Sequence, residues 1–183
     1  MKKKILYALL LVVIVAPYIG FFCLQNWYKD QLAMIHNASF LLISKEDMSL
    51  RRIDYKGVVL DSFPIACGKS YGNKQKQGDM KTPEGVFHIS EIQDASGWTH
   101  DFKDGKGEIE GAYGPYFIRL ETPGHKGIGI HGTHLPESIG TRATEGCIRL
   151  SNNDVTELKE HVHSGMVVII TPSESDVMMN STK

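Results

Sequence analysis

Hydrophobic and polar residues form two different patterns along this chain. Residues 5–24 carry no charge and are mostly apolar, and a helix of that length spans about 30 Å, the thickness of the hydrocarbon core of a bilayer. After a polar stretch at 25–37, short apolar blocks alternate with polar positions, a pattern typical of strands. The pattern therefore predicts an apolar helix followed by a mainly β region.

The strand pattern predicts a β-meander followed by several further strands. Each predicted strand is a short apolar or alternating block bounded by turn residues. The predicted strands are 39–44, 50–55, 58–66, 86–92, 116–121, 127–131, 146–150 and 166–171. Residues 93–114 contain five glycines and little periodicity, so we expect a long loop of functional or mobile character there. We expect these strands to form a mainly β, sandwich-like domain.

One helix is predicted in the second half of the chain. Ser151 or Asn152 can cap its first turn, and Val155 and Leu158 lie on one face. The polar residues 173–183 are expected to form a disordered tail. The predicted domain therefore has a single helix near its C-terminal end.

The basic start and the apolar run together predict a membrane anchor. Residues 1–4 include three lysines and should stay in the cytoplasm, while 5–24 should span the membrane. A cleaved signal peptide is the alternative, but the run exceeds the length of a signal core and no small-residue cleavage site follows it. We expect a single-pass protein of the cytoplasmic membrane, in which a tether at 25–37 leads to an extracytoplasmic domain at 38–172.

The charge balance and the cysteines exclude two classes of protein. The chain has 20 Lys and Arg and 21 Asp and Glu, a net charge of −1, whereas nucleic-acid binding needs a clustered basic surface. Cys23, Cys67 and Cys147 are an odd number of thiols, so they cannot make a disulfide framework. The oligomeric state stays open.

Candidate chemistry is concentrated in residues 127–150. His131 ends a predicted strand, and Cys147 lies between a glycine and another short strand. A histidine near a cysteine can take the thiol proton and later return a proton to a leaving amine. The N–H groups of Gly146 and Cys147 could then hold an oxyanion. A buried core thiol and an unrelated histidine remain the alternative.

This stretch resembles the catalytic domain of the L,D-transpeptidases (the YkuD-type family). The family signature is Ile-His-Gly on a strand, a loop, and then Ser/Thr-His-Gly-Cys followed by an apolar residue and Arg or Asn. Here the signature reads Ile130-His131-Gly132 and Thr144-Glu145-Gly146-Cys147-Ile148-Arg149. Upstream segments that agree with the family are Gly68-Lys69, Thr82–Phe87 and Tyr113–Phe117. The resemblance covers about residues 38–172.

The resemblance implies acyl transfer on the peptide stems of peptidoglycan. Cys147 would attack the carbonyl of the third stem residue, the terminal D-Ala would leave, and a thioester would form. An amine of a neighbouring stem would then make a 3–3 cross-link, whereas water would give L,D-carboxypeptidase activity. Such an enzyme is a carbapenem target and needs neither a metal nor an organic cofactor.

Supporting roles are expected for other residues of the signature region. Gly132 and Thr144 should orient the histidine and the cysteine. Tyr116 and Arg149 are candidates for substrate binding, since a guanidinium can bind a carboxylate through its planar fork. A structural ion pair is the alternative for Arg149.

One position departs from the family pattern, because Glu145 stands where the family has its second histidine. A carboxylate two residues before Cys147 would oppose formation of the thiolate. It could instead hold the cationic amine of a substrate and tune the choice of acceptor, or it could point to solvent. The departure also supports a second hypothesis: a catalytically weak, membrane-tethered module that binds the wall.

Overall fold

The computed structural model describes residues 15–29 and 38–181, and the chain divides into two compact units. Residues 15–29 form a helix whose side chains are all exposed. Within the described residues, no helix is long and apolar enough to cross a membrane. The described part of the chain therefore does not support the expected span over 5–24, of which residues 5–14 lie outside it.

The second unit is built around one eight-stranded sheet. Its strands are β1 (Ser39–Ser44), β2 (Ser49–Asp54), β3 (Val59–Pro64), β5 (Gly85–Asp94), β8 (Tyr116–Glu121), β9 (Gly129–His131), β11 (Ile148–Arg149) and β12 (Val167–Thr171). Their order in the sheet is β11-β9-β8-β5-β12-β1-β2-β3. The pairs β1–β12 and β9–β11 are parallel, and the other neighbours are antiparallel.

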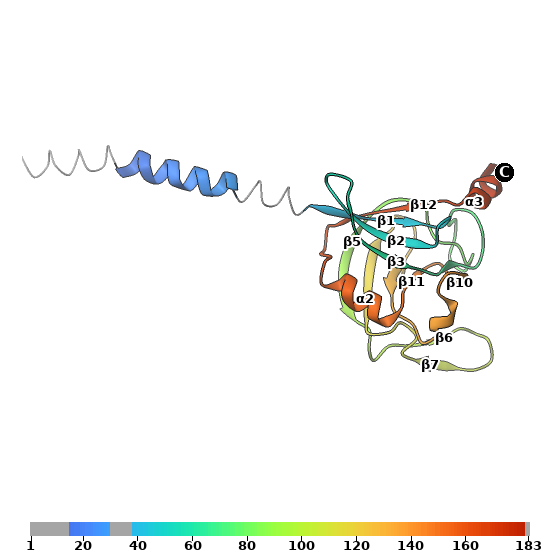
Figure 1. Ribbon diagram of the computed structural model, residues 1–183. Helices are drawn as coiled ribbons and strands as arrows, with labels where there is room; N and C mark the ends of the chain where they lie inside the picture. Colours follow the sequence, from blue (N-terminus) through green and yellow to red (C-terminus); the bar gives the residue numbers. More distant parts are fainter. Residues whose placement is uncertain (1–14, 30–37, 182–183) are drawn as a thin grey trace, which may run out of the picture. The chain divides into compact units, whose positions relative to one another are not determined.

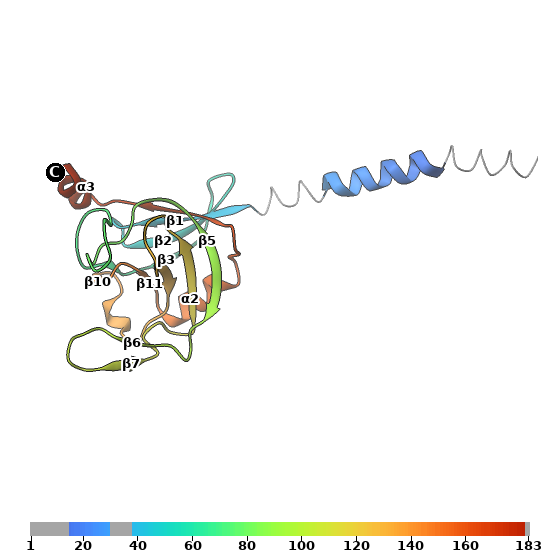
Figure 2. The same ribbon diagram turned by 180° about the vertical axis from the view of Figure 1, so that it is seen from behind.

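The mainly β class is confirmed, but the arrangement differs from a sandwich. Figures 1 and 2 show the large sheet curling around on itself. The parallel pairing of β1 with β12 joins the N-terminal meander to strands from the second half of the chain. All eight strands therefore belong to one continuous hydrogen-bonded sheet. A sandwich would consist of two separate sheets packed face to face.

Two small sheets complete the β structure. β4 (Cys67–Gly68) pairs in parallel with β10 (Arg142–Thr144), and β6 (Thr99–Asp101) pairs antiparallel with β7 (Glu108–Glu110). The β6–β7 hairpin occupies the middle of the segment expected to be a loop. Strands of three residues are too short for their periodicity to show in a sequence, which explains the difference.

The core fills the inside of the curl. Alternate residues of β1 and β12 point inward, and Leu41, Ile43, Val168 and Ile170 are at most 2% exposed. Leu41 is in register with Val168, and Ile43 with Ile170. Period-two alternation on strands with one buried face explains why these segments were predicted correctly.

Helix α2 (Asn152–Lys159) begins as predicted. The Oγ of Ser151 accepts a hydrogen bond from the N–H of Asp154 at 3.1 Å, and Val155 and Leu158 are fully buried. The helix packs against β8 and β9. Its first turn therefore lies close to the strand that carries His131.

The expectation of a disordered tail is wrong, because a second helix, α3 (Glu174–Ser181), follows β12. Asp176 is fully buried and lies 3.1 Å from Nζ of Lys45 and 2.7 Å from Nη2 of Arg142. The N–H and the hydroxyl of Ser173 also donate to its carboxylate. The buried Lys45 and the partly buried Arg142 thus bind the start of this helix. A count of polar residues cannot reveal such contacts.

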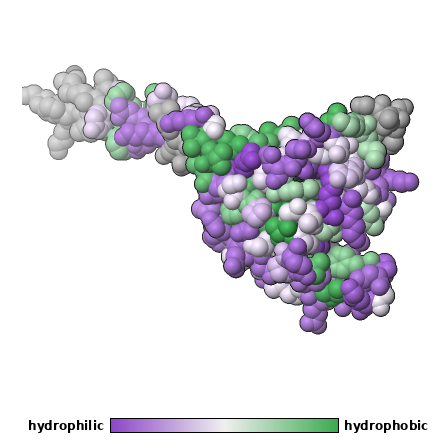
Figure 3. Space-filling view, turned by 45° about the vertical axis from the view of Figure 1, so that its right-hand side comes forward, coloured by the Kyte–Doolittle hydropathy of each residue, from purple (hydrophilic) through white to green (hydrophobic). Residues whose placement is uncertain are grey.

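The surface of the domain is mixed in polarity. Figure 3 shows one face, on which hydrophilic and hydrophobic residues are interspersed. Exposed apolar side chains include Val59 and Leu60 on β3, the edge strand of the sheet.

Candidate active site

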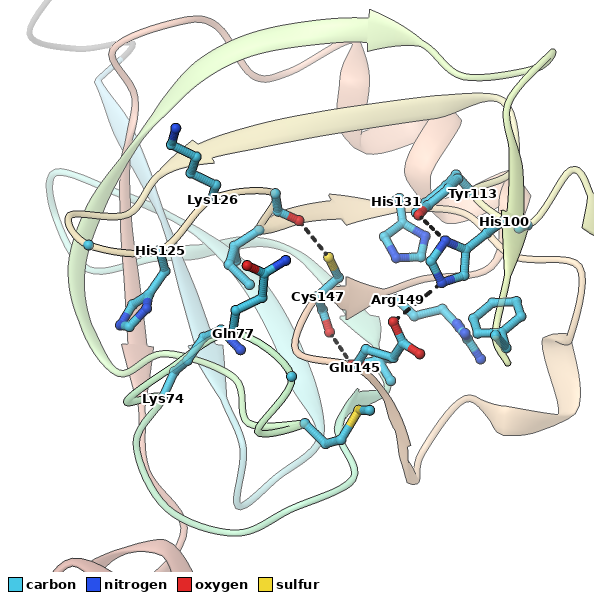
Figure 4. Close-up of a pocket in the computed structure, with 18 residues that line it drawn as sticks. Lys74, Gln77, His100, Tyr113, His125, Lys126, His131, Glu145, Cys147 and Arg149 are labelled. Carbon is cyan, nitrogen blue, oxygen red and sulfur yellow. Dashed lines mark hydrogen bonds and ion pairs between the residues drawn. The ribbon is translucent and has the colours of Figure 1, made fainter. Parts of the chain in front are cut away.

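A cavity of about 630 Å³ lies beside β9 and β11, whose last residues, His131 and Arg149, both line it. Its lining comes from four stretches of the chain, within 74–80, 100–113, 124–131 and 144–149. Figure 4 shows the labelled side chains around it, with Cys147 near the centre. Segments far apart in the sequence therefore converge on one site.

Cys147 and His131 both line this cavity. The strands β9 and β11 run in parallel, with Ile130 opposite Ile148 and His131 opposite Arg149. Cys147 directly precedes β11, so the parallel pairing brings it beside Gly129, the first residue of β9. The structure thus places both side chains on the wall of one cavity.

His131 is held in one tautomer. Its Nδ1 donates a hydrogen bond to the carbonyl oxygen of Gly132 at 2.6 Å, which leaves Nε2 as an acceptor. The ring stacks on Phe117 with ring centres 5.6 Å apart and meets the edge of Tyr113 at 5.1 Å. Burial lowers the pKa of His131 to about 3, although the bond to Gly132 acts in the opposite direction. The imidazole is therefore neutral near pH 7.

The thiol of Cys147 is neutral as well. Its Sγ donates to the carbonyl oxygen of Gly127 at 3.3 Å. Burial raises the pKa of Cys147, whereas a hydrogen bond with the Gly129 backbone and the charge of Lys74 act to lower it. The site at rest thus pairs a thiol with an imidazole, and not a thiolate with an imidazolium.

The turn that carries the cysteine is braced by Thr144. Its Oγ1 donates to the carbonyl oxygen of Cys147 at 2.6 Å and accepts the N–H of Gly146 at 3.1 Å. Gly146 has φ +137°, and a Cβ there would lie 2.7 Å from the carbonyl oxygen of Lys81. Thr144 thus bonds to both residues of the turn, Gly146 and Cys147. The N–H of Gly146, which was expected to face an oxyanion, bonds to Thr144.

Gly132 and Asn152 together fix the end of β9. The Oδ1 of Asn152 accepts the N–H of Thr133 at 2.7 Å, and a Cβ on Gly132 would collide with that oxygen. Gly132 orients His131 through its own carbonyl group. Asn152 was considered only as a cap of α2, and its contact with β9 could be recognised only in the folded chain.

The two candidates for substrate binding lie in different places. Arg149 lines the cavity but is 3% exposed, and its Nη1 donates to Oγ of Ser138 at 2.9 Å. Burial lowers the pKa of Arg149. Tyr116 is not among the residues that line the cavity, and its ring lies 5.4 Å from Nζ of Lys159.

Glu145 lines the cavity and has a side-chain partner. Its Oε2 lies 3.3 Å from Nε2 of His100, and Nδ1 of that histidine lies 2.9 Å from the hydroxyl of Tyr113. His100 was assigned no role from the sequence. The glycine-rich character of 93–114, which indicated a functional segment, was the one available signal.

Lys74 is another lining residue without a role in the sequence analysis. Its Nζ lies 2.8 Å from Oδ1 of Asp79, and the two side chains are 5% and 8% exposed. Burial alone would raise the pKa of Asp79, but hydrogen bonds from Lys74 and from three backbone N–H groups lower it well below its usual range. The aspartate thus holds an ammonium group beside the cavity.

Comparison with known proteins places residues 38–170 in the family of L,D-transpeptidase catalytic domains, YkuD. The YkuD protein of Bacillus licheniformis, which carries an L,D-transpeptidase name, is 35% identical over 114 residues, 62% of this chain and 54% of that protein. YqjB of Bacillus subtilis, named likewise, is 30% identical over 128 residues, 66% of this chain and 68% of that protein. The chain spans about half the length of the YkuD relatives it matches.

Solved structures share the fold. The helical cell shape determining protein Pgp2 of Campylobacter jejuni aligns with a TM-score of 0.56 and 25% identity, over 75% of this chain and 48% of that one. The catalytic domain of the E. faecium L,D-transpeptidase, solved by NMR, aligns with a TM-score of 0.54 and 22% identity, over 74% and 98% of the two chains. With the family match over 38–170, these findings show that the chain belongs to the L,D-transpeptidase catalytic domain family.

Proposed function

We propose that this protein is a cysteine acyltransferase, an L,D-transpeptidase acting on the peptide stems of peptidoglycan. The observation that carries the proposal is the presence of Cys147 and His131 in one cavity, with Nδ1 of the imidazole bonded to the carbonyl of Gly132. That bond leaves Nε2 able to accept the thiol proton. Membership of the family supports the same chemistry.

The first step transfers the stem to the enzyme. Nε2 of His131 takes the thiol proton while Sγ of Cys147 attacks the carbonyl carbon of the third stem residue. The C–N bond to the terminal D-Ala then breaks, and His131 returns the proton to the leaving amine. The products are a thioester on Cys147 and free D-Ala.

The second step resolves the thioester. The amine of a neighbouring stem attacks the thioester carbonyl, and His131 moves the amine proton to the departing sulphur. The new amide is a 3–3 cross-link, and Cys147 returns to the thiol. Because both groups are neutral at rest, the thiol proton has to move to His131 as part of the first step.

The backbone and Glu145 have proposed roles in binding. Since the N–H of Gly146 is bonded to Thr144, the N–H of Cys147 is the remaining candidate for the oxyanion. Glu145 puts a carboxylate on the cavity wall, on the side opposite Lys74 and Lys126 in Figure 4. The ammonium group of the acceptor stem would approach the carboxylate of Glu145. A carboxylate of the donor stem would approach the two lysines.

The proposed substrate also determines a location. Peptidoglycan stems lie outside the cytoplasmic membrane, so we place the domain on the extracytoplasmic side.

Acylation by a carbapenem tests the nucleophile. The purified protein is incubated with the drug, and its intact mass is measured. One covalent adduct is expected on the wild type and none on Cys147→Ser. Cys23 is exposed on the helix at 15–29, so Cys23→Ser is the control, and it should carry the same single adduct as the wild type. An adduct that persists on Cys147→Ser would remove the basis of the proposal.

Analysis of muropeptides identifies the acceptor. Incubation with tetrapeptide muropeptides should yield 3–3 linked dimers and free D-Ala. Tripeptide monomers without dimers would show an L,D-carboxypeptidase. Unchanged muropeptides together with binding to intact wall would show the wall-binding module.

A further inference from the structure

Two histidines besides His131 line the cavity, His100 and His125, and the proposed steps use neither. His100 lies on β6 and lines the cavity with Tyr113 and Glu145. Its Nε2 is 3.3 Å from Oε2 of Glu145, and its Nδ1 is 2.9 Å from the hydroxyl of Tyr113. Figure 4 shows this row of three side chains running along the cavity wall toward His131.

The carboxylate of Glu145 can only accept, so Nε2 of His100 donates to it. The Nδ1 of the same ring forms a hydrogen bond with the hydroxyl of Tyr113. The imidazole ring also meets the edge of Phe102 at 4.4 Å and that of Tyr113 at 5.6 Å. Two hydrogen bonds and two ring contacts therefore determine its position.

The partner of His100 is the residue that departs from the family signature. Glu145 lies two positions before Cys147, where a carboxylate disfavours the thiolate by like-charge repulsion. Among the charged groups around the sulphur, Lys74 and Arg149 favour the thiolate and Glu145 opposes it. The buried imidazole of His131 is neutral, so it does not offset the carboxylate.

We propose that His100 is a positioning residue for Cys147, which acts by holding the carboxylate of Glu145. Its N–H draws the negative charge of Glu145 toward the β6–β7 hairpin, and so limits the repulsion felt by the sulphur. A carboxylate is thereby tolerated where the signature has a histidine. This proposal rests on the proposed function, in which Cys147 is the nucleophile. The effect of His100 on the thiol of Cys147 can nevertheless be measured without any substrate.

The experiment measures alkylation of Cys147 by iodoacetamide as a function of pH, in the full chain with Cys23→Ser. His100→Ala should slow the reaction at pH 7 by about threefold to tenfold, since a rise of one unit in the thiol pKa lowers the thiolate fraction tenfold. His100→Gln keeps an N–H donor for Glu145 and should react nearly as fast as the wild type.

The double variant separates an electrostatic role from a structural one. With Glu145→Gln present, His100→Ala should have no further effect, because the charge that His100 holds is gone. If His100→Ala slows alkylation of Cys147 equally with Glu145 present and with Glu145→Gln, then His100 only supports the hairpin. That result would overturn the proposal. An unchanged rate for His100→Ala would overturn it too.

Two controls accompany these variants. His161→Ala removes an exposed histidine in the turn after α2 and should leave the alkylation rate unchanged. Cys67 is fully buried, so its alkylation in a variant reports unfolding. If His100→Ala unfolds by this criterion, the alkylation rate of Cys147 in His100→Gln decides the outcome. Because alkylation needs no peptidoglycan, a wild type that makes no cross-links would contradict the proposed function without affecting this test.

Discussion

His131 illustrates how burial sets the chemistry of a single residue. In water an imidazole and a thiol titrate near neutral pH, but here burial pushes the two pKa values apart, to about 3 for the imidazole and upward for Cys147. Each group therefore stays in its uncharged form at pH 7. The carbonyl of Gly132 selects the tautomer in which Nε2 can act as the base.

Burial of His131 should also make the folded domain sensitive to acid. The pKa of His131 is lowered from 6.5 to about 3 on folding, so between these pH values the unfolded chain binds more protons. The free energy of unfolding therefore falls as the pH drops from 6.5 toward 3, by at most about 1.4 kcal/mol per pH unit from this group. Urea denaturation at a series of pH values measures this slope.

The variant His131→Gln removes the titrating group and should flatten the slope between pH 6.5 and 4.5. Asp79 and Asp176 also have lowered pKa values, but a carboxylate with an ordinary value of 3.8 loses its stabilising effect only below that window. A slope unchanged by the substitution would show that His131 does not titrate as described.

At the scale of elements, the site depends on short segments held by side-chain hydrogen bonds. The turn before β11 is braced by Thr144, and the end of β9 is held by Asn152 at the start of α2. The β6–β7 hairpin contributes His100 to the cavity. None of these segments is long enough to be stable alone, so the large sheet positions them.

Helix α3 should depend on one buried carboxylate. Asp176→Asn removes the negative charge that lies between Lys45 and Arg142. Breaking a buried ion pair from one side costs about 3–5 kcal/mol, so a loss of that order is expected in the free energy of unfolding, measured in urea. Asp47→Asn is the matched control. It breaks the exposed pair with Arg51 and should cost under about 1 kcal/mol.

At the scale of the whole molecule, the domain and the N-terminal helix are separate units. All residues of the hydrophobic core come from the domain, between Leu41 and Ile170. A chain that begins at residue 38 should therefore unfold cooperatively and react with a carbapenem at the rate of the full chain. Intact mass against time measures that rate. A tenfold loss would show that residues 1–37 contribute to the site.

Much of the fold could be predicted because its main elements carry local signals. Period-two alternation identified β1, β2, β5 and β12, and a capping serine with apolar spacing identified α2. The hairpin β6–β7 and the small β4–β10 sheet were missed, since their strands of two or three residues contain too few apolar side chains to form a block. Helix α3 was missed because its stability comes from a distant ion pair.

The sequence by itself determined the β class, the capped helix and the candidate pair Cys147 and His131, since residue types, spacing and the family signature are all local properties. Only the tertiary structure decided what surrounds that pair. The parallel pairing of β9 with β11 brings distant segments into one cavity. Burial there makes thiol and imidazole neutral, and folding places His100 against Glu145. Contact and desolvation exist only after the chain closes on itself.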